Sequence, residues 1–219
     1  LVWANNPAFT SLQVAEQLRV SADESIYVKN PAFVNKLGKG RLDVLSALTI
    51  TSPSIRTSNQ LLTNIDGNSP DLGETARLYL DFTNFLQPSS AELKATLSSS
   101  SPYITITKSE INLGIIPENS TVRNSTNPFE IILSASLPID HTIEAVLTFS
   151  DGGYQDFQLL NFVIPSYLDV NENNIITSIT SAGRVGYGNA AGQTNGSGFI
   201  YDEESILYEM GLIMGASAK

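Results

Sequence analysis

The chain has 219 residues, enough for one large domain or for several modules, and its length does not choose between them. Its formal charge of −10, from 12 basic and 22 acidic side chains, disfavours nucleic acid and anionic lipid as partners. The sequence contains no cysteine, which excludes disulfides, thiolate metal sites and a cysteine nucleophile. No apolar run reaches the roughly 18 residues of a membrane span, and the apolar start lacks the basic flank of a signal peptide.

Helical patterns occupy the first fifty residues. Residues 1–4 are apolar, and we expect them to end a buried helix that Asn5-Asn6-Pro7 stops, because the residue before a proline avoids the helical conformation. Thr10 or Ser11 can then cap a second helix. The apolar face of that helix is supplied by Leu12, Val14, Ala15, Leu18 and Val20.

A glycine-rich stretch from Gly38 to Leu48 closes this helical segment. Gly38 and Gly40 allow backbone conformations that a Cβ atom penalises. Leu42, Val44, Leu45 and Leu48 follow at helical spacing. By pattern alone, the stretch predicts an amphipathic helix with a flexible entry, ending near Leu48.

Two of these stretches carry a resemblance to a known family. Leu1-Val2-Trp3-Ala4-Asn5-Asn6-Pro7 resembles the end of the helix that the nucleophilic serine opens in subtilisin-like serine peptidases. Gly38 to Leu48 is similar to the sequence that closes the catalytic domain of that family, and the two stretches come in the family's order. The resemblance implies that residues 1–49 are the C-terminal helices of a subtilisin-like α/β catalytic domain.

The resemblance also implies an activity for the parent protein. Subtilisin-like enzymes hydrolyse peptide bonds with a Ser-His-Asp triad, and all three triad elements would lie upstream of this chain. The only histidine is His141, for which we expect a surface turn. An Asp140/His141 pair is unsuited to a triad, because adjacent residues on an extended chain point in opposite directions. We therefore assign no catalytic, cofactor-binding or metal-ligating residue, and expect the chain alone to be inactive.

From residue 50 to residue 166 the pattern alternates apolar and polar side chains, which is typical of strands with one buried face. Asp151-Gly152-Gly153 predicts a tight hairpin into the strand that begins at Tyr154. We expect seven or eight strands and an immunoglobulin-like β-sandwich. The predicted strands lie within 54–63, 77–82, 92–97, 104–107, 112–116, 129–133, 142–149 and 154–164.

Residues 167–219 predict a partial second β module. We expect one strand from Asn171 to Tyr187 and two more within 198–201 and 205–214. About three strands make a poor core, so such a module would continue further or lean on the sandwich.

Two oxygen-rich stretches resemble calcium sites in part. Asp169 to Asn173 begins like a calcium loop, but Asn174 stands where glycine is required and Thr180 where a bidentate glutamate is required. We expect solvated turns in both stretches and no metal site. The second stretch surrounds Gly67 and contains Asn64, Asp66, Asn68 and Asp71.

Three further patterns carry weak functional signals. Gly183 to Gly188 lacks the spacing and the lysine of a phosphate-binding loop. The acidic residues near 202–209 could act as general acid–base pairs, but they are also typical of an exposed hairpin. They are Asp202, Glu203, Glu204 and Glu209. The N-glycosylation pattern occurs at Asn119, Asn124 and Asn195, which matters only on a eukaryotic secretory route.

Taken together, the residues and the resemblance predict a mainly β chain that is the C-terminal portion of an exported, bacterial subtilisin-like serine endopeptidase. We expect it to be secreted or on the cell surface, without a cofactor. Its expected partners are the remainder of the catalytic domain and, through the parent, a protein or peptide substrate. The alternative is a non-enzymatic surface or adhesion protein built of β modules, with the helical start as a cap.

Overall fold

The structure is a computed structural model and describes residues 1–138, 141–163, 167–180, 184–186, 198–207 and 209–211. The chain is mainly β with a few short helices, as the sequence predicts. It forms two compact units, the first of which comprises Leu1–Ser136 and Ile143–Asn161. The boundary predicted between residues 49 and 50 lies inside this first unit.

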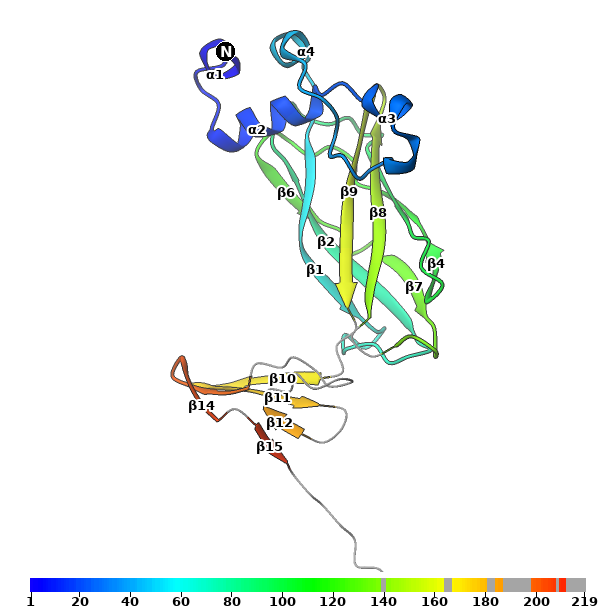
Figure 1. Cartoon of the computed structure of the whole chain (residues 1–219), viewed down its shortest axis with the longest axis vertical. Helices are drawn as coiled ribbons and strands as arrows, with labels where there is room; N and C mark the ends of the chain where they lie inside the picture. The colour runs from blue at the N-terminus through cyan, green and yellow to red at the C-terminus, as the bar shows by residue number, and fades with distance from the viewer. Residues whose placement is uncertain (139–140, 164–166, 181–183, 187–197, 208, 212–219) are drawn as a thin grey trace, which may run out of the picture. The chain divides into compact units, whose positions relative to one another are not determined.

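Four α-helices and one 3-10 turn precede the strands and gather at one end of the first unit (Figure 1). Thr10 begins the longest helix with a capping box, in which its hydroxyl accepts from the Gln13 amide and the Gln13 side chain accepts from the Thr10 amide. Asp43 caps the last helix by accepting from the Ser46 amide at 3.0 Å. Within the described residues, no helix has the length and hydrophobicity to cross a lipid bilayer. The elements are α1 (Val2–Asn5), α2 (Ser11–Val20), α3 (Ile26–Lys29), η1 (Pro31–Phe33) and α4 (Val44–Thr49).

Two antiparallel sheets make up the rest of this unit. The five-stranded sheet has the order β1-β2-β7-β4, with β6 also paired to β2, and the four-stranded sheet has the order β5-β3-β8-β9. This arrangement matches the ABED and CFG sheets of an immunoglobulin-like sandwich, with one extra strand on each sheet. The strands are β1 (Ile55–Thr63), β2 (Thr75–Asn84), β3 (Lys94–Ser98), β4 (Ile104–Lys108), β5 (Glu110–Asn112), β6 (Ser120–Arg123), β7 (Phe129–Leu133), β8 (Thr142–Asp151) and β9 (Tyr154–Val163).

The core lies between the two sheets. Alternate residues of β2 and β8 are buried, which confirms the period of two in the sequence. Phe82 of one sheet meets Phe149 of the other edge to face, with ring centroids 6.3 Å apart. The hairpin predicted at Asp151-Gly152-Gly153 joins β8 to β9, and Gly152 has the positive φ of +57° that the turn requires. The largest fully buried side chains are Phe82, Phe129, Phe149, Ile55, Leu78, Leu80, Leu93, Leu97, Ile111, Ile116, Ile131 and Leu133.

The strand predicted at 112–116 is wrong. β5 ends at Asn112, because the Asn112 side chain accepts a hydrogen bond from the Gly114 amide at 2.7 Å and turns the chain. Gly114 has a φ of +66°, outside the strand region. β6 was not predicted, because its sequence Ser-Thr-Val-Arg shows no apolar alternation.

Asn124 fills the gap between β6 and β7 along the edge of β2. Its side-chain oxygen accepts from the Leu80 amide at 2.8 Å, and its amide donates to the Leu78 carbonyl at 3.2 Å. The residue is 5% exposed. A glycan on Asn124 is therefore incompatible with the folded sandwich, whereas Asn119, which carries the same sequence pattern, is exposed.

The free edges of β1 and β9 face each other and are joined through side chains. The side chain of Gln158 bonds to the backbone of Thr57 twice. Its oxygen accepts from the Thr57 N–H at 2.9 Å, and its nitrogen donates to the Thr57 carbonyl at 3.0 Å. Gln60 donates to the Asn161 carbonyl at 3.1 Å. Side chains thus replace the missing strand pairing along this seam and protect both edges from adding further strands.

The second unit contains a six-stranded sheet. The single strand predicted from Asn171 to Tyr187 is wrong, since the chain reverses at Asn173 and Asn174, and Asn173 takes a φ of +55°. β11 pairs with β10 on one edge and with β12 and β13 on the other. The strands are β10 (Tyr167–Glu172), β11 (Ile175–Thr180), β12 (Arg184–Gly186), β13 (Phe199–Tyr201), β14 (Glu204–Leu207) and β15 (Glu209–Gly211).

Candidate functional site

Helix α2 rests on the sandwich through polar side chains. Gln13 donates to the Phe85 carbonyl at 3.1 Å and to Glu118 at 2.9 Å. Gln17 instead joins α2 to α4, because it donates to the carbonyls of Ala47 and of the C-cap Ile50 at 3.1 and 2.8 Å. Both glutamines are buried, at 3% and 6% exposure, while Leu12 on the same helix is 61% exposed. The helix therefore buries polar residues and leaves the apolar residue Leu12 facing solvent.

A buried ionic cluster also joins α2 to the sandwich. We call the contacts of Gln13 and of this cluster the junction. Arg19 of α2 donates to Asp156 of β9 at 2.7 Å and to the Ser54 hydroxyl at 2.8 Å. It also pairs with Glu16 one turn earlier, at 2.7 Å. The Asp156 side chain is fully buried and accepts a second hydrogen bond, from the Tyr154 hydroxyl, at 2.9 Å. These contacts join the helical segment to both sheets of the sandwich.

Electrostatics keep Arg19 charged. Burial alone favours a neutral Arg19, but the nearby charges of Asp156 and Glu16 outweigh it and raise the pKa of the guanidinium. Burial, followed by the charge of Asp156, raises the pKa of Tyr154, so this hydroxyl remains protonated. Ser54 is completely buried and hydrogen-bonded to charged partners, so no substrate can reach it as a nucleophile.

The glycine-rich stretch reaches the sandwich next to this cluster. Arg41 pairs with Asp23 through two backbone hydrogen bonds, of 2.8 and 3.0 Å, and through an ion pair. Gly40 is needed there, because a Cβ atom would lie 2.4 Å from the Asp23 carbonyl oxygen. Lys39, between the two glycines, pairs with Glu24 and donates to the Gln155 carbonyl of β9 at 2.9 Å. The predicted flexible entry is thus a pinned loop.

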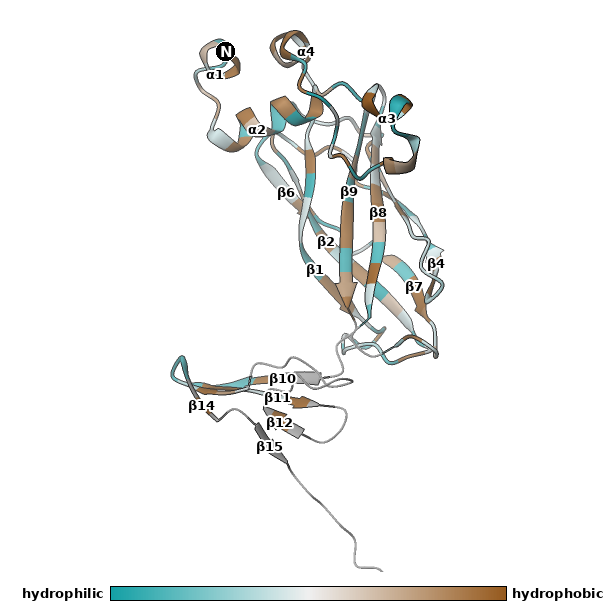
Figure 2. Ribbon diagram, in the orientation of Figure 1, coloured by the Kyte–Doolittle hydropathy of each residue, from teal (hydrophilic) through white to brown (hydrophobic). Residues whose placement is uncertain are grey.

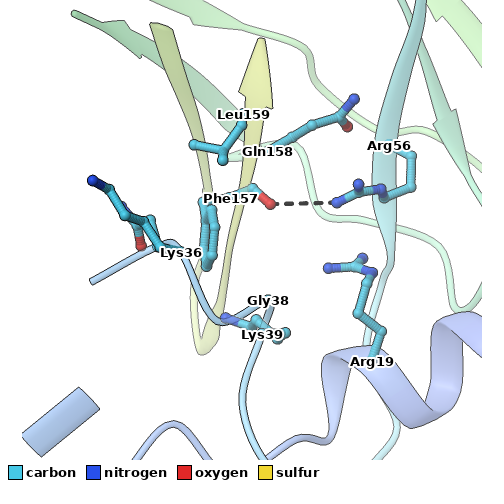
Figure 3. A pocket seen from close by; sticks show the side chains of 9 residues that line it. Arg19, Lys36, Gly38, Lys39, Arg56, Phe157, Gln158 and Leu159 are labelled. Atoms are coloured by element: carbon cyan, nitrogen blue, oxygen red, sulfur yellow. Dashed lines mark hydrogen bonds between the residues drawn. The ribbon is translucent and has the colours of Figure 1, made fainter. Parts of the chain in front are cut away.

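A pocket of about 330 Å³ opens between this loop, β1 and β9 (Figure 3). Four cations line it, and no carboxylate does. Arg19 and Arg56 point into it from α2 and β1, as Figure 3 shows, and Arg56 donates to the Phe157 carbonyl at 3.3 Å. The lining residues are Arg19, Asn35, Lys36, Gly38, Lys39, Arg56, Phe157, Gln158 and Leu159.

The helical segment also leaves many large apolar side chains exposed. Leu45 and Val28 are 72% and 83% exposed, although Ala47 on the same helix as Leu45 is buried. Hydrophobic residues are visible on α1 and α4 in Figure 2. We call this set the apolar face. Its members are Leu1, Trp3, Leu12, Val28, Phe33, Val34, Leu37, Leu42, Val44, Leu45 and Ile50.

Several candidate metal-binding or catalytic residues of the sequence lie in hairpins of the second unit. Asn171 and Glu172 lie in β10, so the stretch that resembles a calcium loop forms a hairpin. Asp202 and Glu203 form the exposed turn between β13 and β14, both with positive φ. In the described part of the chain, no group of three or more acidic or histidine side chains is arranged to hold a metal.

Other candidates are placed only in part. The Asn64 side chain accepts from the Asp66 and Asn68 amides at 3.1 and 3.0 Å, which closes the turn around Gly67 on itself. His141 lies half-buried just before β8, whereas Asp140 is outside the described residues. The following also lie outside them: Asn195, Gly183, Tyr187 and Gly188, and the side chain of Glu209.

Sequence reasoning missed the junction and the pocket. Arg19 and Asp156 are 137 residues apart, and nothing in the local pattern of either residue indicates the other. The one available signal was the pair of glutamines, Gln13 and Gln17, which stand one helical turn apart and share a face of α2.

The sequence matches no protein-family model, and the comparison with curated proteins found no relative. The residues and their geometry therefore carry the functional argument.

Proposed function

We propose that the chain is the C-terminal portion of an exported subtilisin-like serine endopeptidase. In this proposal, residues 1–49 are the closing helices of the catalytic domain, and the sandwich is a spacer or interaction module. The observation that carries the proposal is the orientation of the helical segment: Gln13 and Arg19 of α2 bond to the sandwich, while the apolar face is exposed.

This orientation is the reverse of what an isolated cap needs. A helical cap on a sandwich gains stability by burying apolar side chains, at about 25 cal/mol per Å². Here Leu42, Val44 and Leu45 are exposed instead. Large exposed apolar patches in soluble proteins mark surfaces that another part covers. The covering part that fits the sequence resemblance is the α/β sheet of a subtilisin-like domain.

The junction gives the sandwich a mechanical role in this proposal. Arg19, Asp156 and Lys39 hold the helical segment and the strands in one compact unit. A catalytic domain built on these helices would carry the sandwich in a fixed orientation. The sandwich would then act as a rigid spacer or a second contact surface for protein substrates.

The chemistry of the parent would be peptide-bond hydrolysis by a Ser-His-Asp triad encoded upstream of Leu1. Residues 1–219 supply the helices and the accessory modules, and no triad member is assigned to them. A serine-directed fluorophosphonate probe should therefore label a longer chain that includes the upstream region, and not residues 1–219 alone.

Reading the codons that precede Leu1 is the first test. An upstream Asp, His and Gly-Thr-Ser-x-Ala-x-Pro serine in the same frame, together with labelling of the longer chain, would support the proposal. Upstream β repeats without these elements would contradict it and favour the surface or adhesion protein. Labelling of residues 1–219 alone would contradict the assignment of the chemistry to the upstream part.

A further inference from the structure

The pocket beside the junction is positively charged in a protein whose total charge is −10. Two of its four cations are neutralised within the protein. Arg19 pairs with Asp156 and Glu16, and Lys39 pairs with Glu24. These two residues thus form a structural wall of the pocket.

The other two cations, Arg56 and Lys36, lack such partners. Within the described residues, neither has a carboxylate within ion-pair distance. The guanidinium of Arg56 is half-buried and makes one hydrogen bond, to the Phe157 carbonyl. Burial, and then the like charge of Arg19, lower the pKa of Arg56. An anion in the pocket would relieve both effects, because it would pair with Arg56 and offset the repulsion between the two guanidiniums.

The rest of the lining sets the size and polarity of the ligand. A volume of about 330 Å³ lies at the lower end of the usual range for small-molecule sites. Phe157 and Leu159 form an apolar part of the wall, and Leu159 is 52% exposed. The pocket thus combines a fixed cationic end with an apolar side.

We propose that this pocket binds a small oxyanion, with Arg56 pairing with its oxygen atoms and Phe157 and Leu159 contacting any apolar group attached to it. Carboxylates and phosphates share this chemistry. The planar guanidinium can donate two parallel hydrogen bonds to either of them. This site is independent of the protease proposal, since every residue in it belongs to the first unit of this chain.

The test is a titration of the full 219-residue chain, labelled with ¹⁵N, at constant ionic strength. Acetate, benzoate and inorganic phosphate are added in separate experiments, with chloride replaced in each. We expect saturable shifts of the Phe157, Gln158 and Leu159 amide signals with at least one oxyanion. Tighter binding of benzoate than of acetate would indicate an organic carboxylate, and tightest binding of phosphate would indicate a phosphate group.

Variants connect the binding to Arg56. Arg56→Gln should weaken binding about tenfold or more, the effect of losing a charge-assisted hydrogen bond. Lys29→Gln removes the same charge from an exposed position outside the pocket and should leave binding unchanged. If Arg56→Gln fails to give a folded spectrum, Lys36→Gln on the exposed loop takes its place and should weaken binding several-fold. The absence of saturable shifts with all three anions, or equal weakening by Lys29→Gln, would overturn the proposal.

Discussion

The guanidinium of Arg19 and the carboxylate of Asp156 approach to 2.6 Å and connect α2 to β9. The Asp156 side chain is fully buried, and that of Arg19 is 20% exposed. A buried pair of this kind is costly to break, because the remaining charge is left without a partner.

We therefore expect Asp156→Ala to lower the free energy of unfolding of the first unit by about 3–5 kcal/mol. Urea denaturation followed by tryptophan fluorescence measures this, since Trp3 is the only tryptophan and lies in the helical segment. Glu110→Ala is the control. It breaks the exposed pair with Lys94 and should cost less than about 1 kcal/mol. An equal decrease in the free energy of unfolding in the two variants would show that the junction does not stabilise the fold.

Gly40 is expected to tolerate no side chain. Gly40→Ala places a Cβ atom 2.4 Å from the Asp23 carbonyl oxygen at a φ of +143° and should cost about 2 kcal/mol or more. Gly38→Ala is the matched control, because Gly38 has a φ of +68° but nothing within 4 Å of a new Cβ, so its cost should be about 1 kcal/mol. Thermal unfolding of both variants gives the comparison. A smaller loss of stability for Gly40→Ala than for Gly38→Ala would contradict the close approach of Gly40 to the Asp23 carbonyl.

The side chain of Asn124 should contribute to stability through the backbone of β2. Asn124→Ala removes its hydrogen bonds to Leu80 and Leu78 and leaves buried backbone groups unpaired, at a cost of about 2 kcal/mol. Asn68→Ala, at an exposed loop position, should change the stability by less than about 0.5 kcal/mol. Amide exchange of Leu80 gives a second readout, since this N–H should lose protection in Asn124→Ala alone.

Acid should weaken the bridge between Asp23 and Arg41. Hydrogen bonds from the Ser25 side chain and amide, together with Arg41, lower the pKa of Asp23 to about 2 in the folded chain. The unfolded value is about 3.9, so the ionised carboxylate stabilises the fold above about pH 4, and this contribution is lost as the pH falls toward 2. The difference in urea midpoint between the natural chain and Asp23→Asn should therefore shrink over this range. Ser25→Ala should show part of the same effect, whereas a difference that stays constant with pH would contradict the assignment.

The apolar face gives a prediction that depends on the proposed function. Leu45→Ala should change the stability of residues 1–219 by less than about 0.5 kcal/mol, since Leu45 is 72% exposed. Leu97→Ala, the same change in the core, should cost about 3 kcal/mol. In a longer chain with the upstream region, Leu45→Ala should become destabilising by about 2 kcal/mol or more, because the sheet would cover it. An unchanged effect in the longer chain would argue against a covering domain.

Local sequence signals predicted much of the fold. The alternation in β2 and β8 marked strands with one buried face, and Asp151-Gly152-Gly153 marked the hairpin, because both depend on neighbouring residues. The sequence offers Thr10 or Ser11 as the cap of α2, and Thr10 is the cap. The reversal at Asn173 and Asn174 was missed, because it uses asparagine for the positive φ that glycine usually supplies.

The sequence by itself determined the β-rich class, the helical start and the β8–β9 hairpin, since the physics of each acts between residues close in the chain. Only the tertiary structure decided which face of α2 is buried. Composition predicts that glutamines face water, yet Gln13 and Gln17 face the protein because carbonyls from distant segments accept their hydrogen bonds. The pairing of Arg19 with Asp156 and the pocket beside it likewise exist only once the seam between β1 and β9 has formed, because long-range contacts leave no local pattern in the sequence.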